Sequence, residues 1–236
     1  MTRISLQASA LTTTLLSCLL LPTRALPAES PTIEQPQPPA GAPNVVVVIL
    51  DDVGFGAAST FGGPVDTPAL EALAGEGLRY NRFHTTAICS PTRAALLTGR
   101  DAHTANVGTV LNTANAYPGY QGILNPQTAT IAEVLRQRGY NTAAVGKWHL
   151  TPSWESSQAG PFDRWPTGVG FEKFYGFLGG ETDQFNPTLY GGTRPVFRPE
   201  GVEYHVTVDM ALAALAWLQM QPSLAPGRPF FLYFAS

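Results

Sequence analysis

The stretch NVVVVIL, residues 44–50, decides the fold because it is an unbroken apolar run rich in β-branched valine. Such a run predicts a strand covered on both faces, as in the middle of an α/β sheet. Asp51 and Asp52 follow this strand directly. Because functional sites of such sheets lie at the carboxyl ends of the strands, both carboxylates are expected at the mouth of a site.

Helical and strand-like segments alternate along the rest of the chain. Helical spacing or start signals mark four stretches, 67–78, 90–99, 128–139 and 207–220. Apolar runs predict further strands at 79–85, 141–146 and 228–236, and Gly, Pro and aromatic residues predict long loops with short strands over 151–202. This alternation predicts an α/β fold with a largely parallel central sheet flanked by helices. A central-looking strand ends the chain at Ser236, so the fold is expected to be truncated at its C-terminal side.

Capping residues place the helix ends. Thr67 and Ser90 are predicted as N-caps, because each is followed by a proline that fits the first turn of a helix. Gly99 and Gly139 are predicted to end the second and third helices, because glycine adopts the left-handed conformation that terminates a helix.

The first 43 residues are predicted to lie outside the folded domain. Residues 1–28 combine Arg3, an apolar run and small residues near a cleavage site, which predicts a signal peptide and export. The run is too short for a stable membrane span; an uncleaved anchor, or lipidation at Cys18, is the alternative. Residues 29–43 are proline-rich and poor in large apolar side chains, which predicts a disordered linker.

Composition narrows the function classes. Hydrophobic residues make up 44% of the 236 residues, enough for a sizeable core, and charged residues only 13%. The net charge is −3 and no basic run occurs, which argues against nucleic acid as a partner. Removal of the leader would leave Cys89 as the only cysteine, so it is expected to be an intermolecular partner, a reactive thiol or a modified residue.

Cys89 opens the stretch CSPTRAALLTG, where a helix is predicted to begin. Helix N-termini favour anions, and Arg93 lies about one turn further on the same face. A nucleophile, a guanidinium and a helix N-terminus together suit a tetrahedral oxyanion such as sulfate or phosphate. A buried, inert cysteine and a low-pKa thiolate nucleophile remain the alternatives.

Asp51 and Asp52 form the second constellation. A bound cation would relieve the repulsion between adjacent carboxylates, and oxygen ligands favour Ca²⁺ or Mg²⁺ over zinc. A solvated turn in which an aspartate caps a helix is the alternative.

The third constellation is GYNTAAVGKWHL, residues 139–150. Residues two apart in an extended chain face the same way, so Lys147 and His149 are expected on one side. Lysine can hold an anionic oxygen and histidine can exchange a proton near neutral pH. A surface lysine and a histidine with ordinary hydrogen bonds are the alternative.

Taken together, ILDDVGFG, CSPTRAALLTG and GYNTAAVGKWHL resemble the sulfatase family of the alkaline-phosphatase-like superfamily. The second stretch matches its C-x-P-x-R signature and the third its second signature, in the same order and at similar spacing. The resemblance covers residues 44–236 and is greatest for the bacterial arylsulfatase type. It implies that these residues are the N-terminal part of a catalytic domain. The leader, in turn, predicts that the protein is exported to a bacterial periplasm or secreted.

The resemblance implies that a formylglycine-generating or equivalent enzyme oxidises Cys89 to formylglycine (3-oxoalanine). One hydroxyl of its hydrate would attack the sulfur of a small-molecule sulfate ester, and the other would later expel sulfate. Asp51, Asp52 and the modified Cys89 would bind Ca²⁺, with Mg²⁺ as the alternative.

The remaining roles follow from the same resemblance. Arg93 would hold the hydrate, Lys147 would bind a sulfate oxygen, and His149 would hydrogen-bond the hydrate and assist its collapse. The family's leaving-group histidine, its second lysine and its further metal ligands have no counterpart in the sequence, and the other three histidines (His84, His103 and His205) have no motif support. A phosphonate monoester or phosphodiester hydrolase, and an inactive fragment or binding module, remain the competing hypotheses.

Overall fold

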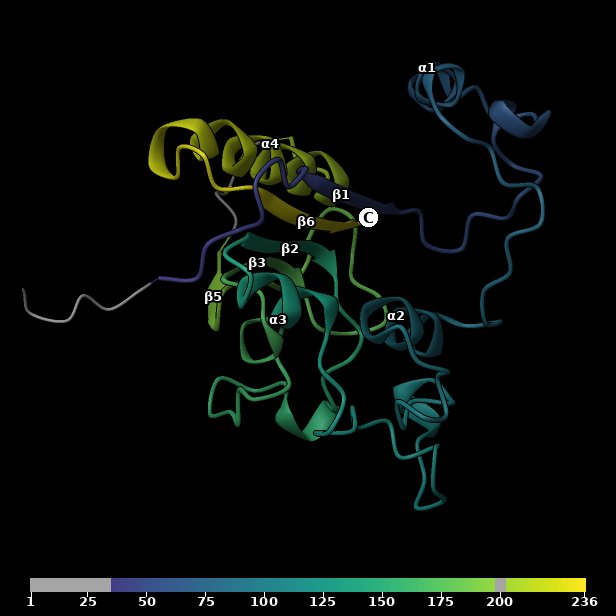
Figure 1. Ribbon diagram of the computed structural model, residues 1–236. Helices are drawn as coiled ribbons and strands as arrows, with labels where there is room; N and C mark the ends of the chain where they lie inside the picture. The colour runs from purple at the N-terminus through teal and green to yellow at the C-terminus, as the bar shows by residue number, and fades with distance from the viewer. Residues whose placement is uncertain (1–34, 198–202) are drawn as a thin grey trace, which may run out of the picture. The chain divides into compact units, whose positions relative to one another are not determined.

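The computed structural model describes residues 35–197 and 203–236 (Figure 1). The predicted signal peptide, Cys18 and the first residues of the predicted linker lie outside these ranges, so those interpretations stay predictions. Residues 35–44 have no helix or strand, and Pro36 and Pro38 lie close to Gly139. No helix of the described residues is long and apolar enough to cross a membrane.

The described residues form one six-stranded sheet, largely parallel as predicted. Its strands are β1 (Val45–Ile49), β2 (Asn141–Lys147), β3 (Lys173–Phe177), β4 (Leu189–Gly191), β5 (Arg194–Val196) and β6 (Phe230–Ala235). They are arranged in the order β1-β6-β2-β3-β4-β5. Strands β1, β6, β2 and β3 are parallel, whereas β4 and β5 are antiparallel to their neighbours. The sheet therefore brings the carboxyl ends of β1, β6 and β2 side by side.

All four predicted helices form. They are α1 (Pro68–Glu76), α2 (Cys89–Thr98), α3 (Ile131–Arg136) and α4 (Val206–Leu224). Ala144 and Tyr233 belong to a buried cluster that includes Ala132 of α3, whereas Val145 belongs to a second cluster with Met210 of α4. Because successive strand residues face opposite sides of a sheet, α3 and α4 cover opposite faces (Figure 1).

Among the described residues, β1 does not occupy the predicted position in the middle of the sheet. β1 pairs only with β6 among the described strands and is an edge strand. Its valines alternate in burial, and Val46 and Val48 are 50% and 55% exposed. A run of β-branched residues indicates that a strand forms, but not how many strands pair with it. The strands whose residues are mostly buried are β2 and β6.

The predicted strand at 79–85 is also wrong, because these residues are irregular and exposed. Tyr80 and Phe83 project into solvent, and Arg79 donates a hydrogen bond to the backbone oxygen of Thr60 (3.0 Å). The sequence has strand propensity, but no strand of the described residues lies beside it to complete a ladder.

Two of the predicted helix ends shift. The N-cap of α2 is Ile88, so Cys89 is the first helical residue and Ser90, predicted as the cap, lies buried with its hydroxyl unpartnered. Helix α3 ends before Gly139, which still adopts a left-handed conformation in the following turn. Gly99 ends α2 in that conformation, as predicted.

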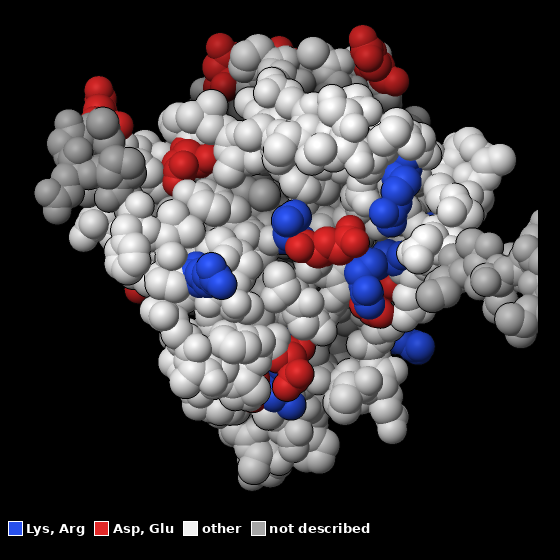
Figure 2. All heavy atoms as spheres, turned by 90° about the vertical axis from the view of Figure 1, so that its left-hand side faces the viewer, with Lys and Arg blue, Asp and Glu red and all other residues white. Residues whose placement is uncertain are grey.

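Charged side chains are dispersed over the face of the molecule that Figure 2 shows. On the face shown in Figure 2, Lys and Arg lie singly or in small groups beside Asp and Glu, without an extended basic patch.

Candidate active site

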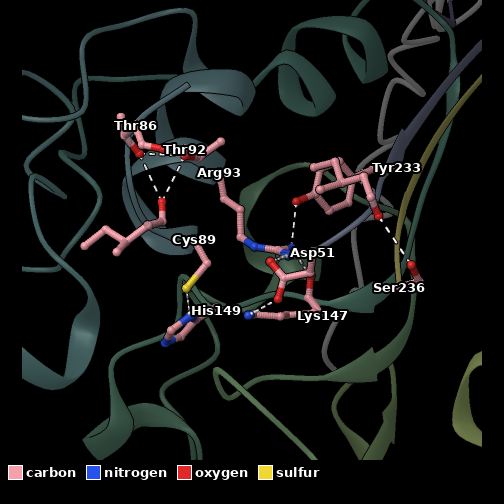
Figure 3. A network of polar contacts seen from close by, with 11 residues as sticks. Asp51, Thr86, Cys89, Thr92, Arg93, Lys147, His149, Tyr233 and Ser236 are labelled. Atoms are coloured by element: carbon pink, nitrogen blue, oxygen red, sulfur yellow. Dashed lines mark hydrogen bonds and ion pairs between the residues drawn. The ribbon is translucent and has the colours of Figure 1, made fainter. Parts of the chain in front are cut away.

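The carboxyl ends of β1 and β2 and the first turn of α2 converge on one site (Figure 3). Asp51 and Asp52 follow β1, Lys147 is the last residue of β2, and His149 lies two residues beyond it. Cys89 approaches from the first turn of α2. Thus segments from all three motifs of the sequence meet, as the resemblance implied.

Asp51 links the two basic residues of the site. Its Oδ2 accepts a hydrogen bond from Nζ of Lys147, and its Oδ1 accepts one from Nη2 of Arg93 at 3.2 Å. Burial alone would raise the pKa of Asp51, but the hydrogen bonds and positive charges of Lys147 and Arg93 outweigh it and hold this pKa below its usual value. Asp51 is therefore ionised at neutral pH.

Arg93 is the most buried charged residue at the site, with 1% exposure. Its Nη1 donates to the backbone oxygen of Lys147 (2.5 Å) and to the hydroxyl oxygen of Tyr233 (3.0 Å). Its Nε is buried and has no hydrogen-bond partner among the described residues. The guanidinium is thus held on one side by protein acceptors and keeps one buried donor unpaired.

Cys89 and His149 lie in contact: Sγ is 3.0 Å from Nδ1. His149 is 4% exposed, and burial, followed by the charges of Lys147 and Arg93, lowers its pKa to about 4, against the opposing effect of Asp51. The imidazole is therefore neutral near pH 7 and can accept a proton. Its Nε2 is buried, and no group in the described part of the chain hydrogen-bonds to it.

Two residues at the site were not predicted from the sequence. Tyr233 lies in an apolar strand, where a buried hydroxyl requires a hydrogen-bond partner; that requirement was the available signal. Gly180 lies against the His149 ring, and a Cβ there would come within 2.7 Å of Cε1. The Gly-Gly pair after β3 marked this loop only as a turn.

The predicted metal ligands Asp51, Asp52 and Cys89 line one open cavity of about 360 Å³. The two carboxylates match the oxygen ligands that Ca²⁺ and Mg²⁺ prefer. However, no group of three or more His, Cys, Asp or Glu suited to a metal occurs in the parts of the chain that the structure describes. The donor chemistry fits a hard divalent cation, and the number of ligands falls below the six to eight of a typical Ca²⁺ site.

The remaining histidines contact other groups. Nδ1 of His205 accepts a hydrogen bond from the backbone N–H of Thr207 and caps α4, and His103 contacts Asp101 and Tyr120. His84 is exposed.

Comparison with known proteins agrees with the motifs. The family model described as Sulfatase matches residues 43–236. The chain is 37% identical over 159 residues to an arylsulfatase of Klebsiella aerogenes, covering 66% of this chain and 32% of that protein. It is 33% identical over 221 residues to arylsulfatase A of Homo sapiens, covering 84% and 41%. The chain thus spans well under half of these relatives.

A solved structure shares the fold. The putative sulfatase yidJ from Bacteroides fragilis superimposes with a TM-score of 0.63 at 23% identity, covering 87% of this chain and 45% of that chain. The similarity identifies the alkaline-phosphatase-like fold, with a mostly parallel sheet between helices.

Proposed function

The chain belongs to the sulfatase family, and from this membership we propose that it carries the nucleophile of a sulfuric ester hydrolase of the arylsulfatase type. The observation that carries the proposal is the contact between Cys89, inside C-x-P-x-R, and a neutral His149 beside two buried cations. This arrangement suits an anionic ester whose reacting centre lies next to residue 89.

The nucleophile that we propose is formylglycine formed from Cys89, as in sulfatases generally. The cysteine Sγ stands in for one of the two hydroxyl oxygens that the hydrate would carry on Cβ. That group would supply one hydroxyl to attack sulfur, displacing the alcohol, and a second whose deprotonation expels sulfate and restores the aldehyde.

His149 is the residue that we propose to assist proton movement at residue 89. Its Nδ1 is 3.0 Å from Sγ of Cys89, within hydrogen-bonding distance of an oxygen attached at that position. With a pKa lowered to about 4, the imidazole is unprotonated at neutral pH, so its Nδ1 can accept a hydrogen bond from a hydroxyl at residue 89; the same low pKa makes it a weak base.

Lys147 and Arg93 supply positive charge to the oxyanion. Both are buried, so their charges are less screened than those of surface residues. Lys147 is proposed to hold a sulfate oxygen and Arg93 the hydroxyl groups at residue 89. The positive N-terminal end of α2 points at the same place.

Asp51, Asp52 and residue 89 are the proposed ligands of a Ca²⁺ or Mg²⁺ ion. Such an ion would supply further charge stabilisation for the sulfate oxygens. Its remaining ligands would be water, backbone oxygens or other groups.

Mass spectrometry of the Cys89 peptide tests the nucleophile. Protein made in its native host is expected to carry formylglycine at residue 89, and Cys89→Ala should lower aryl sulfate hydrolysis by at least ~10³-fold. An intact thiol in an active wild-type protein would contradict the mechanism.

The type of ester is tested separately, since the same nucleophile and cations also suit a phosphonate monoester or a phosphodiester. The kcat/KM values for an aryl sulfate and an aryl phosphonate are compared at the same pH and metal concentration. A higher kcat/KM for the sulfate is expected, and a preference for the phosphonate would assign the alternative hydrolase activity. A small-molecule substrate, a separate modifying enzyme and export remain predictions.

A further inference from the structure

The orientation of the Arg93 guanidinium depends on three different strands. Asp51 follows β1, Lys147 ends β2, and Tyr233 lies in β6, which pairs with both of those strands. Tyr233 contributes the one side-chain acceptor on Nη1, because the other acceptor of this nitrogen is a backbone oxygen. Figure 3 shows its hydroxyl directed at the guanidinium.

The aromatic ring of Tyr233 is itself held firmly. The residue is 1% exposed, and its ring lies against Trp148 and Phe171, with centroids 6.5 and 6.0 Å away. A ring packed on several sides keeps one rotamer, so the position of the hydroxyl is set by the core. The acceptor is therefore placed before any ligand arrives.

The chemistry of this acceptor differs from that of Asp51. Burial raises the pKa of the Tyr233 hydroxyl, which stays protonated and uncharged. A neutral oxygen orients the guanidinium through one hydrogen bond but adds no negative charge. Asp51, in contrast, shares its charge between Arg93 and Lys147. Positive charge therefore remains available to an anion.

We propose that Tyr233 is a positioning residue that directs the Arg93 guanidinium toward the oxyanion at residue 89. The inference rests on the proposed function of Arg93. Tyr233 acts through Arg93, and its loss lets the guanidinium rotate away from the geometry that the reaction requires.

The variant Tyr233→Phe removes the hydroxyl and keeps the ring. Position 233 lies outside C-x-P-x-R, so the signature stays intact, and activities are normalised to the formylglycine content measured by mass spectrometry. Because a hydrogen bond to a charged group is lost, kcat for an aryl sulfate should fall ~10-fold or more. KM should change less than ~2-fold, as expected for an interaction that matters in the transition state.

Tyr140→Phe is the matched control. Tyr140 is also a buried tyrosine of the same core cluster, and its hydroxyl makes no hydrogen bond with the residues that the structure describes. This variant should keep wild-type kcat and KM. Equal losses in both variants, or an unchanged kcat in Tyr233→Phe, would overturn the inference.

A second measurement does not depend on catalysis. The ¹⁵N NMR signals of the Arg93 side chain, assigned by their loss in Arg93→Lys, should show slowly rotating Nη groups in the wild type and faster rotation in Tyr233→Phe. Averaged Nη signals in the wild type would overturn the inference even if Tyr233→Phe failed to fold. If the wild type hydrolysed no sulfate ester while these signals behaved as expected, the proposed function would fail but the positioning of Arg93 by Tyr233 would stand.

Discussion

Backbone strain coincides with chemistry at two residues of the site. Asp52 and His149 have φ values of 55° and 51°, in the left-handed region that residues other than glycine adopt uncommonly. Such conformations cost about 1–3 kcal/mol each and persist where the surroundings hold them. These two conformations therefore lower the stability of the fold, and they orient the Asp52 carboxylate and the His149 imidazole at the site.

The ionisation of His149 should make stability depend on pH. Burial and the charges of Lys147 and Arg93 disfavour its protonated form only in the folded protein, so the unfolded chain binds the proton at higher pH. The free energy of unfolding should thus fall as pH drops from about 6.5 to about 4, by up to about 1.4 kcal/mol per pH unit.

Denaturant titrations between these pH values measure this slope, with unmodified Cys89 and a chelator present. The slope should be smaller in His149→Gln. An NMR titration should place the imidazole midpoint near 4, and a midpoint near the ordinary 6.5 would show that the site does not exclude the proton.

Membership of the site could be predicted from the sequence only for residues that lie in short motifs. Cys89, Arg93, Lys147 and His149 each follow a recognisable local pattern, and the structure brings them together. Tyr233 was not predictable as a member, since its partner comes from a helix 140 residues earlier and only the fold joins them. Long-range pairing of this kind leaves no local pattern.

Among the elements, β2 depends on close backbone contact with its neighbours. Gly146 has φ 107°, and a Cβ there would lie 1.8 Å from the backbone oxygen of Ala235 in β6. A Cβ at Gly176 of β3 would likewise lie only 2.0 Å from the backbone oxygen of Gly146. The strand that supplies Lys147 therefore tolerates no side chain one residue earlier.

Gly146→Ala should consequently destabilise the protein by at least ~3 kcal/mol, through strain and separation of the strands. Gly75→Ala is the control, because nothing lies within 4 Å of its ideal Cβ and it is inside α1. That change should stabilise by about 0.5–1 kcal/mol through helix propensity. Denaturant unfolding followed by circular dichroism measures both, and a Gly146→Ala midpoint equal to wild type would contradict the expected clash.

Whether a segment forms a helix was easier to predict than which strands lie side by side in the sheet. The helices follow from spacing and caps, since these are local properties. The pairing of β1 and the irregular path of 79–85 depend on which strands lie alongside, and strand propensity carries no such information.

At the scale of the whole described chain, the edge position of β1 is expected to favour self-association. Its outer edge is unpaired within the described residues, and exposed Val46 and Val48 lie along it. Unprotected apolar edge strands pair with other chains. Purified chain should therefore associate increasingly with concentration.

Val48→Lys should reduce this association, because a charge on an edge strand opposes pairing. Val134→Lys serves as the control, since Val134 is similarly exposed but lies on α3. Light scattering over a range of concentrations measures the average mass. A wild-type chain that stays monomeric, or equal effects of both variants, would exclude β1 as the contact.

Arg93 is hydrogen-bonded to Asp51 after β1, to Lys147 at the end of β2 and to Tyr233 within β6, so the proposed chemistry should depend on the cooperativity of the sheet. A slip of one strand against another would displace an acceptor of the guanidinium before the sheet came apart. Amide hydrogens of Lys147 and Tyr233 should therefore exchange in one cooperative unit, at the same opening free energy. Heat that loosens this unit would abolish turnover while most helices remained intact.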